Sequence, residues 1–231
     1  MYRNIRYLGA VALLTAAAGS AQAGCNDYPQ PGVDWHGCSK ANRLMAGYDF
    51  HGANLERTDL SDSDLSGANF TDARLAKSNL SRAVLKGAKF ERADLTKATL
   101  DRADLTGAAL GNALLEKASV DRAKLAMANL AGAKLEKAEL KRAVLAGADL
   151  SGAGLAGADL SRADLRRARL NQSNLLDADL RLADLRGANL TGAVGLTQAQ
   201  LADTCGDGTT KLPPDIVVPS TWPCASRGDE E

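Results

Sequence analysis

Residues 93–112 read ADLTKATLDRADLTGAALGN, a stretch in which a large apolar residue recurs at every fifth place. The pattern runs without a break from Phe50 to Leu190, where 25 of the 29 such residues are Leu and the others are Phe50, Phe70, Phe90 and Val120. Two places before each lies a small residue in all but one case; it is Ala in 24 of the 29 and Thr58, Ser63, Ser78 or Ser173 in four, and Tyr48 is the one bulky exception. A helix needs apolar residues about 3.6 apart and a strand needs them two apart, so this period fits neither element.

The five-residue unit predicts a short extended segment followed by a corner. We number its places from the small residue, so that Leu takes the third place. Residues at the first and third places point to the same side of an extended segment, and the last two places turn the chain. Successive units then wind into a coil whose Leu rows are buried against neighbouring coils. Proline would remove a donor from such a ladder, and all six prolines lie outside the repeat: Pro29, Pro31, Pro213, Pro214, Pro219 and Pro223.

A second period, of 20 residues, indicates four sides per coil. The three phenylalanines are 20 apart, and Gly recurs at fifth places 67, 87, 107, 147 and 187, interrupted by Met127 and Arg167. Two series of cations follow the same spacing, and they are Lys77, Lys97, Lys117 and Lys137, and Arg82, Arg102, Arg122, Arg142 and Arg162. With coils about 4.8 Å apart, as neighbouring strands are, seven coils make a rod about 34 Å long.

The units Ala53-Asn54-Leu55, Ala68-Asn69-Phe70 and Ala93-Asp94-Leu95-Thr96 resemble those of the pentapeptide-repeat proteins. That family's consensus is a small residue, Asp or Asn, Leu or Phe, a small polar residue and Gly. The resemblance implies an all-β fold, a right-handed quadrilateral β-helix of about seven to eight coils. The chain departs from the consensus at many fifth places, which hold Arg or Lys instead of Gly.

Residues 1–23 are typical of an export signal. Arg3 and Arg6 precede an apolar stretch, 8–18, that is too short to span a bilayer, and Ala21-Gln22-Ala23 is a small-x-small cleavage site. The alternatives are a buried N-terminal helix, or lipid attachment at Cys25 with Gln22 where a lipobox has Leu. Cleavage removes two of the 28 basic residues, leaves 26 against 28 acidic ones, and leaves no transmembrane segment. We expect an exported, periplasmic or secreted bacterial protein that does not bind nucleic acid generally.

The four cysteines form one pair at each end of the repeat. Four cysteines allow three pairings, and proximity favours disulfides between Cys25 and Cys38 and between Cys205 and Cys224, as expected for an exported chain. A zinc site is the competing interpretation. No pair has Cys-x-x-Cys spacing, and His36 and His51 are not placed as partners, so we predict neither metal nor cofactor.

The chain divides into a repeat at 48–194 between two caps. Residues 24–47 are predicted to form the N-terminal cap and an irregular first coil, with Trp35 over the core and Lys40 and Arg43 at inward places. Residues 195–231 are predicted to form the C-terminal cap. Thr197 and Gln200 make a capping box, and Leu196 and Leu201 make a hydrophobic staple. They predict a short capping helix of one to two turns, which is expected to end at Gly206 after Cys205. The Pro-rich run beyond it would bring Trp222 onto an apolar surface and end in a frayed acidic tail.

We identify no catalytic constellation, and we predict that the protein is not an enzyme. Many second places hold aspartate, and eight of these residues could be mistaken for acid–base pairs. Asp side chains at such corners more often bond to neighbouring backbone. The eight are Asp59, Asp94, Asp104, Asp149, Asp159, Asp164, Asp179 and Asp184.

The lysine and arginine series are the candidate binding residues. Between residues 76 and 145 there are 14 basic and 8 acidic residues, an excess of six positive charges. Such charge can simply solvate the surface, with Asp101 neutralising Arg102, Asp121 neutralising Arg122 and Glu136 neutralising Lys137. The functional hypothesis is a non-enzymatic structural or binding rod of the cell envelope, which presents these columns to an anionic envelope polymer or a protein. The alternative is a DNA-mimicking topoisomerase inhibitor of the quinolone-resistance type, which the export signal and the basic stripe disfavour.

Overall fold

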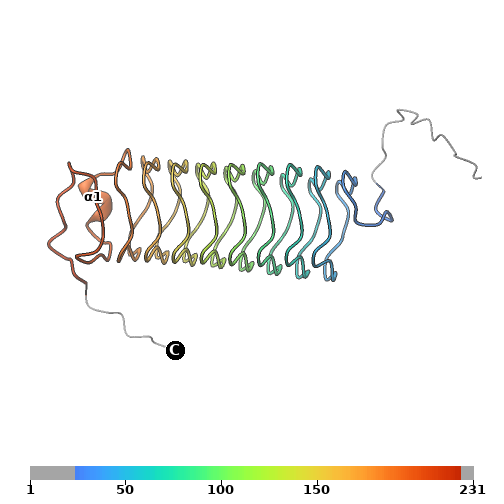
Figure 1. Cartoon of the computed structure of the whole chain (residues 1–231), viewed down its shortest axis with the longest axis horizontal. Helices are drawn as coiled ribbons and strands as arrows, with labels where there is room; N and C mark the ends of the chain where they lie inside the picture. The colour runs from blue at the N-terminus through green and yellow to red at the C-terminus, as the bar shows by residue number, and fades with distance from the viewer. Residues whose placement is uncertain (1–23, 225–231) are drawn as a thin grey trace, which may run out of the picture.

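The computed structural model describes residues 24–224, which form a rod of stacked coils (Figure 1). Residues 20 apart pair as isolated parallel β-bridges, always at the second place of the unit. Four rows of bridges run along the rod, beginning at Asp34, Ser39, Leu44 and Asp49. The 20-residue period therefore corresponds to one coil, and residues at equivalent places stack in columns.

Each side of a coil is only three residues long, and its backbone groups alternate between the two neighbouring coils. The Asp104 N–H donates to the Ala83 carbonyl of the preceding coil at 2.9 Å, and the Leu105 N–H donates to the Lys124 carbonyl of the next at 2.7 Å. Each coil is thus bonded on both faces without any strand longer than one bridge among residues 24–224. Short sides suit the sequence because only the first and third places face inward.

The corners are tight turns with the geometry of type II. The Leu105 carbonyl accepts the Ala108 N–H at 2.9 Å, and Gly107, the third residue of this turn, has φ +67°. A positive φ at this position is the requirement that makes Gly the consensus residue at the fifth place. The same conformation is adopted by 20 non-glycine residues of the described chain.

The interior is a column of Leu and Ala with almost no solvent access. Every third-place residue from Phe50 to Leu190 is at most 2 % exposed. The rings of Phe50, Phe70 and Phe90 stack at centroid distances of 5.0 and 4.7 Å, and Trp35 packs edge-on against Phe50 at 5.5 Å. Each buried Leu stabilises the fold by about 1.5–3 kcal/mol relative to exposure.

The N-terminal end begins with the disulfide between Cys25 and Cys38. Trp35 is buried, and its Nε1 donates to the Asp27 carbonyl. Lys40 and Arg43 occupy inward places in the repeat, but Arg43 is exposed and Lys40 is only half-buried, with its Nζ 3.9 Å from the Trp35 ring centroid. The first coil can accommodate these cations because no other coil of residues 24–224 precedes it on those sides.

The C-terminal end is covered by α1 (Gln198–Leu201), the helix coloured orange-red in Figure 1. The predicted capping box between Thr197 and Gln200 is confirmed, and both staple leucines are buried. The helix makes a single turn, within the one to two turns predicted, but the predicted end at Gly206 is wrong because the C-cap is Ala202. The Gln200 Nε2 donates to the carbonyls of Leu175 and Ala178, so this side chain of the helix caps the backbone of the last coil.

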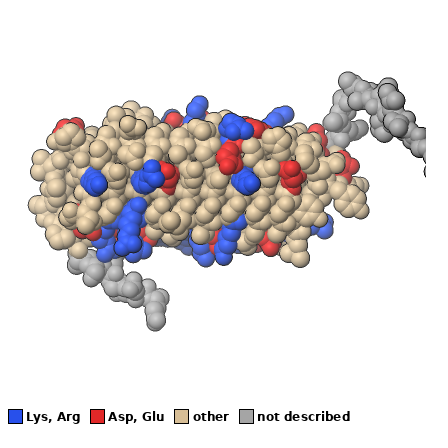
Figure 2. Space-filling view, viewed as in Figure 1, with Lys and Arg blue, Asp and Glu red and all other residues tan. Residues whose placement is uncertain are grey.

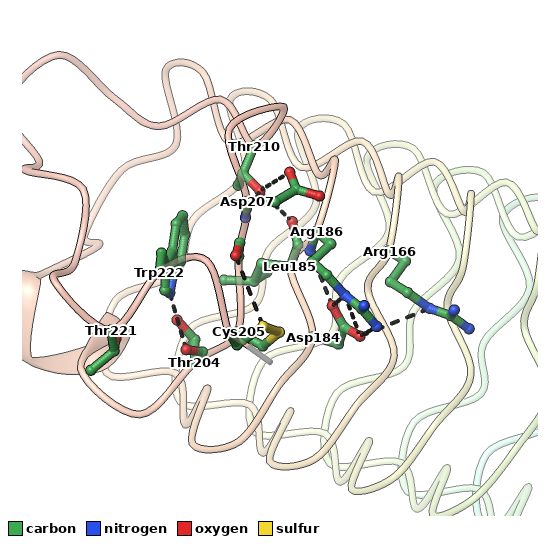
Figure 3. Close-up of a disulfide and its surroundings, with 12 residues drawn as sticks. Arg166, Asp184, Leu185, Arg186, Thr204, Cys205, Asp207, Thr210, Thr221 and Trp222 are labelled. Atoms are coloured by element: carbon green, nitrogen blue, oxygen red, sulfur yellow. Dashed lines mark hydrogen bonds and ion pairs between the residues drawn. A yellow bond between two sulfur atoms is a disulfide. The ribbon is translucent and has the colours of Figure 1, made fainter. Parts of the chain in front are cut away.

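The chain beyond α1 folds back over the core and is held by the disulfide between Cys205 and Cys224 (Figure 3). The Trp222 indole is buried, and its Nε1 donates to the Thr204 carbonyl at 3.0 Å. Cys205 and Lys211 extend two of the bridge rows by pairing with Asp184 and Asn189. The predicted export signal at 1–23 and the acidic tail after residue 224 lie outside the described residues.

Candidate anion-binding surface

The predicted cation series form two columns at adjacent corners of the rod. The fifth places 77 and 82 lie at the two ends of the same side, and the i to i+20 pairing carries both positions along the axis. Their side chains project from corners whose backbone φ is close to +60° at all nine positions: Lys77, Lys97, Lys117, Lys137, Arg82, Arg102, Arg122, Arg142 and Arg162. The left-handed conformation costs an L-residue about 1–2 kcal/mol relative to its right-handed one. Folding alone therefore favours Gly at these corners.

Two of the nine column cations have an acidic partner. Arg82 binds Asp62 of the preceding coil through two parallel bonds, from Nε and Nη2, each of 2.6 Å. This bidentate bond holds the pKa of Asp62 below its ordinary value. The Arg122 Nε lies 3.6 Å from an Asp121 carboxylate oxygen, which is a looser contact.

The other seven have no ion pair or side-chain hydrogen bond with another residue of the described chain; they are Lys77, Lys97, Lys117, Lys137, Arg102, Arg142 and Arg162. The expectation that Asp101 neutralises Arg102 is wrong, because the Asp101 carboxylate accepts from the Ser119 hydroxyl and the Asp121 N–H of the next coil. Glu136 likewise forms no ion pair with Lys137, and its Oε2 is buried without a hydrogen-bond partner. Ion pairs with neighbouring acidic residues therefore neutralise only a small part of the positive charge of these columns.

The side between the two columns carries no charge at its centre. Its second places in three consecutive coils are Asn79, Thr99 and Ser119, while acidic residues appear further along at Glu139 and Asp159. The Asn79 amide donates to Asp59 and the Ser119 hydroxyl to Asp101, so both are ordered. The central coils thus present a neutral polar strip about 10 Å long, given the spacing of neighbouring strands, between two rows of cations.

The second-place aspartates have the structural role that the sequence predicted. All eight accept the backbone N–H two residues ahead; the Asp104 carboxylate, for example, accepts from Thr106 at 3.2 Å, and the others behave in the same way. Three of them also hold the arginine at the fourth place of the same unit. The Asp179 carboxylate binds Arg181 in this manner, and that hydrogen bond keeps the pKa of Asp179 low. These carboxylates are occupied and are poor candidates for catalysis.

A hollow that sequence reasoning did not identify lies at a third corner. It has a volume of about 680 Å³ and is lined by Met127, Gly147, Arg166, Arg167 and Arg186, among others. Met127 is 70 % exposed, and its Sδ lies where a side chain at Gly147 would start, because the Met127 side chain leans toward the following coil. The interruption of the glycine series at Met127 and Arg167 was the available signal. Arg166 and Arg186 are bonded to Asp164 and Asp184, as Figure 3 shows for Arg186. Arg167 is therefore the one arginine of this lining that forms no ion pair with a described residue.

Neither a metal centre nor a membrane helix is found in the part of the chain that the structure describes. No group of three or more His, Cys, Asp or Glu side chains in residues 24–224 is placed to hold a metal ion. No helix in the same range is long and apolar enough to cross a bilayer.

On the face shown in Figure 2, charged side chains are separated by wide uncharged areas, and Lys and Arg side chains gather along its lower margin.

The family model for pentapeptide repeats matches residues 49–87, 78–116, 123–162 and 163–194. The chain belongs to the pentapeptide-repeat family. This confirms the resemblance on which the sequence interpretation rested, and the matched segments coincide with the bridged coils. No match was found among curated protein sequences.

Solved structures of other pentapeptide-repeat proteins are similar to this one. HetL, involved in heterocyst differentiation regulation in the cyanobacterium Nostoc sp. strain PCC 7120, is 32 % identical; the match covers 69 % of this chain and 81 % of HetL, with a TM-score of 0.39. A trypsin-treated variant of QnrB1, a plasmid-mediated fluoroquinolone resistance protein, is 20 % identical over 74 % of this chain and 89 % of its own, with a TM-score of 0.53. At that identity the likeness to QnrB1 concerns the fold alone.

Proposed function

We propose that this pentapeptide-repeat protein is a non-enzymatic rod of the cell envelope that binds an anionic envelope polymer through its two cation columns. The observation that carries the proposal is that seven of the nine column cations are unpaired within the described chain, although they occupy corners where Gly is preferred. Unpaired like charges in one column repel each other, and a polyanion lying along the columns would remove that repulsion.

The geometry of the columns suits an extended polymer better than a small ligand. Coils repeat at about the spacing of neighbouring strands, 4.8 Å, so each column offers a cation at that interval along the axis. Arginine forks bind carboxylate and phosphate groups in two-point fashion, and the lysines opposite supply point charges. The neutral strip of Asn79, Thr99 and Ser119 lies between them and offers hydroxyl and amide groups to a polysaccharide.

Export is the second part of the proposal, and two observations support it. Two disulfides close the ends of the rod, and such bonds persist in oxidising compartments. The sequence of residues 1–23 has the order of an export signal. Membership of the pentapeptide-repeat family also supports a right-handed quadrilateral β-helix as the form of the rod.

The test is a titration of the protein with polygalacturonate, a carboxylate polymer, at about 0.05 M and about 0.2 M salt, where screening differs strongly. The variant Lys97→Gly/Lys117→Gly/Arg102→Gly removes three unpaired cations at corners that accept Gly. The matched control Arg166→Gln/Arg181→Gln/Arg186→Gln removes the same charge from arginines that are bonded to aspartates. We expect binding that weakens with salt, is reduced at least tenfold in the first variant, and is largely retained in the control.

Equal binding by the two variants would show that net charge, and not the columns, attracts the polymer. Absence of binding by the wild type to polygalacturonate and to phosphatidylglycerol vesicles would reduce the columns to a solubilising surface. Topoisomerase inhibition, the alternative function, is tested separately in a gyrase supercoiling assay. Inhibition at low micromolar protein concentration would favour that alternative.

A further inference from the structure

The first coil, residues 33–52, departs from the repeat at its inward places. In later coils the first place is almost always Ala and the third almost always Leu. Five inward residues of the first coil are neither, and all five line one hollow of about 460 Å³ at the blue end of the rod in Figure 1, which we call the N-terminal hollow; they are Trp35, Lys40, Arg43, Met45 and Tyr48. The departures from the repeat are therefore gathered around a single space.

Residues 25–29 form the other wall of the N-terminal hollow. The disulfide between Cys25 and Cys38 and the bond from the Trp35 Nε1 to the Asp27 carbonyl hold this segment against the first coil. Tyr28, in this segment, is 86 % exposed, and Tyr48, in the first coil, is 45 % exposed. Two aromatic rings that are accessible to solvent thus border the hollow.

Two cations line the same hollow without an acidic partner. Neither Lys40 nor Arg43 forms an ion pair or a side-chain hydrogen bond with another described residue, although the Lys40 Nζ lies over the Trp35 ring. Burial and the nearby Arg43 lower the pKa of Lys40 from its ordinary value, and Asp27 only partly opposes them. Asp27 is the one acidic residue of the lining, so the hollow has an excess of one positive charge. Like charges held together in this way favour an anion beside them.

The backbone of Leu44 adds a hydrogen-bond donor to the lining. In later coils the second-place N–H donates to the preceding coil, as the Asn54 N–H does to the Val33 carbonyl. No other coil of residues 24–224 precedes Leu44 on its side, and its N–H bonds to no other described residue. This donor therefore faces the end of the rod at which the N-terminal hollow lies.

We propose that the N-terminal hollow binds a small monocarboxylate that carries an aromatic ring. The Arg43 guanidinium and the Lys40 ammonium hold the carboxylate, with the Leu44 N–H as a further donor. An arginine fork suits a carboxylate because it can form two parallel bonds to it. The ring of the ligand packs against Tyr28 and Tyr48, since aromatic rings attract one another in offset or edge-on contact.

The size and charge of the hollow narrow the class of ligand. Its volume is within the range of about 300–1,000 Å³ that is usual for small-molecule sites. A dianion such as a phosphate monoester would exceed the single positive charge of the lining, whereas a monocarboxylate balances it. The site lies at the end of the rod, whereas the cation columns lie along its sides, so the proposal does not depend on polymer binding by the columns.

The fold by itself favours other residues at these places. Leu at position 40 would restore the repeat and add buried apolar area, and Ala would do so at positions 43 and 48. A half-buried lysine instead loses part of its hydration. Ligand binding supplies a reason for these side chains that packing does not.

Isothermal titration with phenylacetate measures binding to the whole protein. We expect a Kd of about 0.1–1 mM, because a ligand with so few atoms makes a limited number of contacts. The neutral analogue phenylacetamide tests for the charge, and acetate tests for the ring. Each should bind at least tenfold more weakly than phenylacetate.

Three substitutions restore the repeat while they remove parts of the site: Arg43→Ala, Lys40→Leu and Tyr48→Ala. Each should weaken phenylacetate binding at least fivefold. The melting temperatures of the Arg43→Ala and Lys40→Leu variants should not decrease, so that weaker binding is not a result of unfolding. The matched control is Arg167→Gly, which removes an exposed arginine without an ion pair from a corner that accepts Gly and should retain binding.

Three results would each overturn the proposal: no binding of phenylacetate by the wild type, equal binding of phenylacetamide, or wild-type affinity in Arg43→Ala. A lower melting temperature of Lys40→Leu would show that the fold requires this lysine and would remove it from the site. The titration with polygalacturonate reports on the columns separately, so failure of one proposal leaves the other distinguishable.

Discussion

Replacing column arginines by Gly should stabilise the fold, while replacing the same arginines by Ala should not. Arg102, Arg142 and Arg162 have φ of +59°, +59° and +62°, and none has an ion pair with another described residue. All three lie at the third residue of a type II turn, where the backbone is left-handed. We compare the triple Gly variant with the triple Ala variant, because both remove the same three charges.

The magnitude follows from two opposing terms. The left-handed conformation costs an L-residue about 1–2 kcal/mol, which Gly avoids. Gly also gives the unfolded chain more freedom than Ala, which costs about 0.5–1 kcal/mol. The difference is about 0.5–1 kcal/mol per corner in favour of Gly, or about 1.5–3 kcal/mol for three corners, whose backbone effects should add.

Denaturant unfolding followed by circular dichroism measures the difference as a shift in midpoint. Removal of like-charge repulsion should affect the two variants equally, so it cancels in the comparison. A triple Ala variant as stable as the triple Gly variant would show that these corners are not strained. Arginine at these corners would then cost the fold nothing, and its presence there would not point to binding.

Three further predictions concern the core, the pH dependence and the chain ends. Leu105 is 1 % exposed, so Leu105→Asp should lower the free energy of unfolding by at least the roughly 1.5–3 kcal/mol of Leu burial and disrupt several coils. An unchanged circular dichroism spectrum and melting temperature would contradict the assigned register. Hydrogen bonds from Arg82 and Arg181 lower the pKa of Asp62 and Asp179 in the folded protein. The stability that these two carboxylates contribute is therefore complete above the pKa of an unfolded carboxyl and is lost as the pH falls through the pKa of the folded state. Melting temperatures should decrease below about pH 4, and a flat profile would argue against these pairs. Mass spectrometry of protein from an envelope fraction should show a chain that begins at Gly24 and has no free thiols, whereas an intact Met1 or four alkylatable cysteines would contradict export.

The repeat itself was predictable because its signal is local and repeated 29 times. Ala at the first place and Leu at the third imply the inward-facing pair, and the recurrence of Phe and Gly every 20 residues implies four sides. The structure confirms these features in its bridges and in the burial of the third-place residues. The capping box at Thr197 and the short helix were also predictable, since the residues of the box are close in sequence, but the residue at which the helix ends was not. The helix stops at Leu201 because the chain must turn to bring Cys205 into the bridge row at Asp184.

The candidate binding surface was predictable in position but not in electrostatic state. Periodicity alone assigns Arg82 and Arg102 to one column. Only the three-dimensional contacts show that Arg82 is bonded to Asp62 of the preceding coil, whereas Asp101 turns away from Arg102 toward Ser119. Neighbours in sequence can point to different coils, so a count of adjacent charges cannot decide which cations are free to bind.

The sequence by itself determined the coil, because each unit specifies its own corner and its own inward residues without reference to distant parts of the chain. The tertiary structure alone decided how the two ends differ. Backbone groups of an inner coil are satisfied by the coils above and below, and this holds for any repeat of the pattern. At the two ends of the described chain one neighbouring coil is missing, so the backbone groups are satisfied only where irregular residues fold over the edge. Gln200 and Lys211 do so at the C-terminal end, whereas at the N-terminal end no residue of 24–224 bonds to the backbone of Leu44.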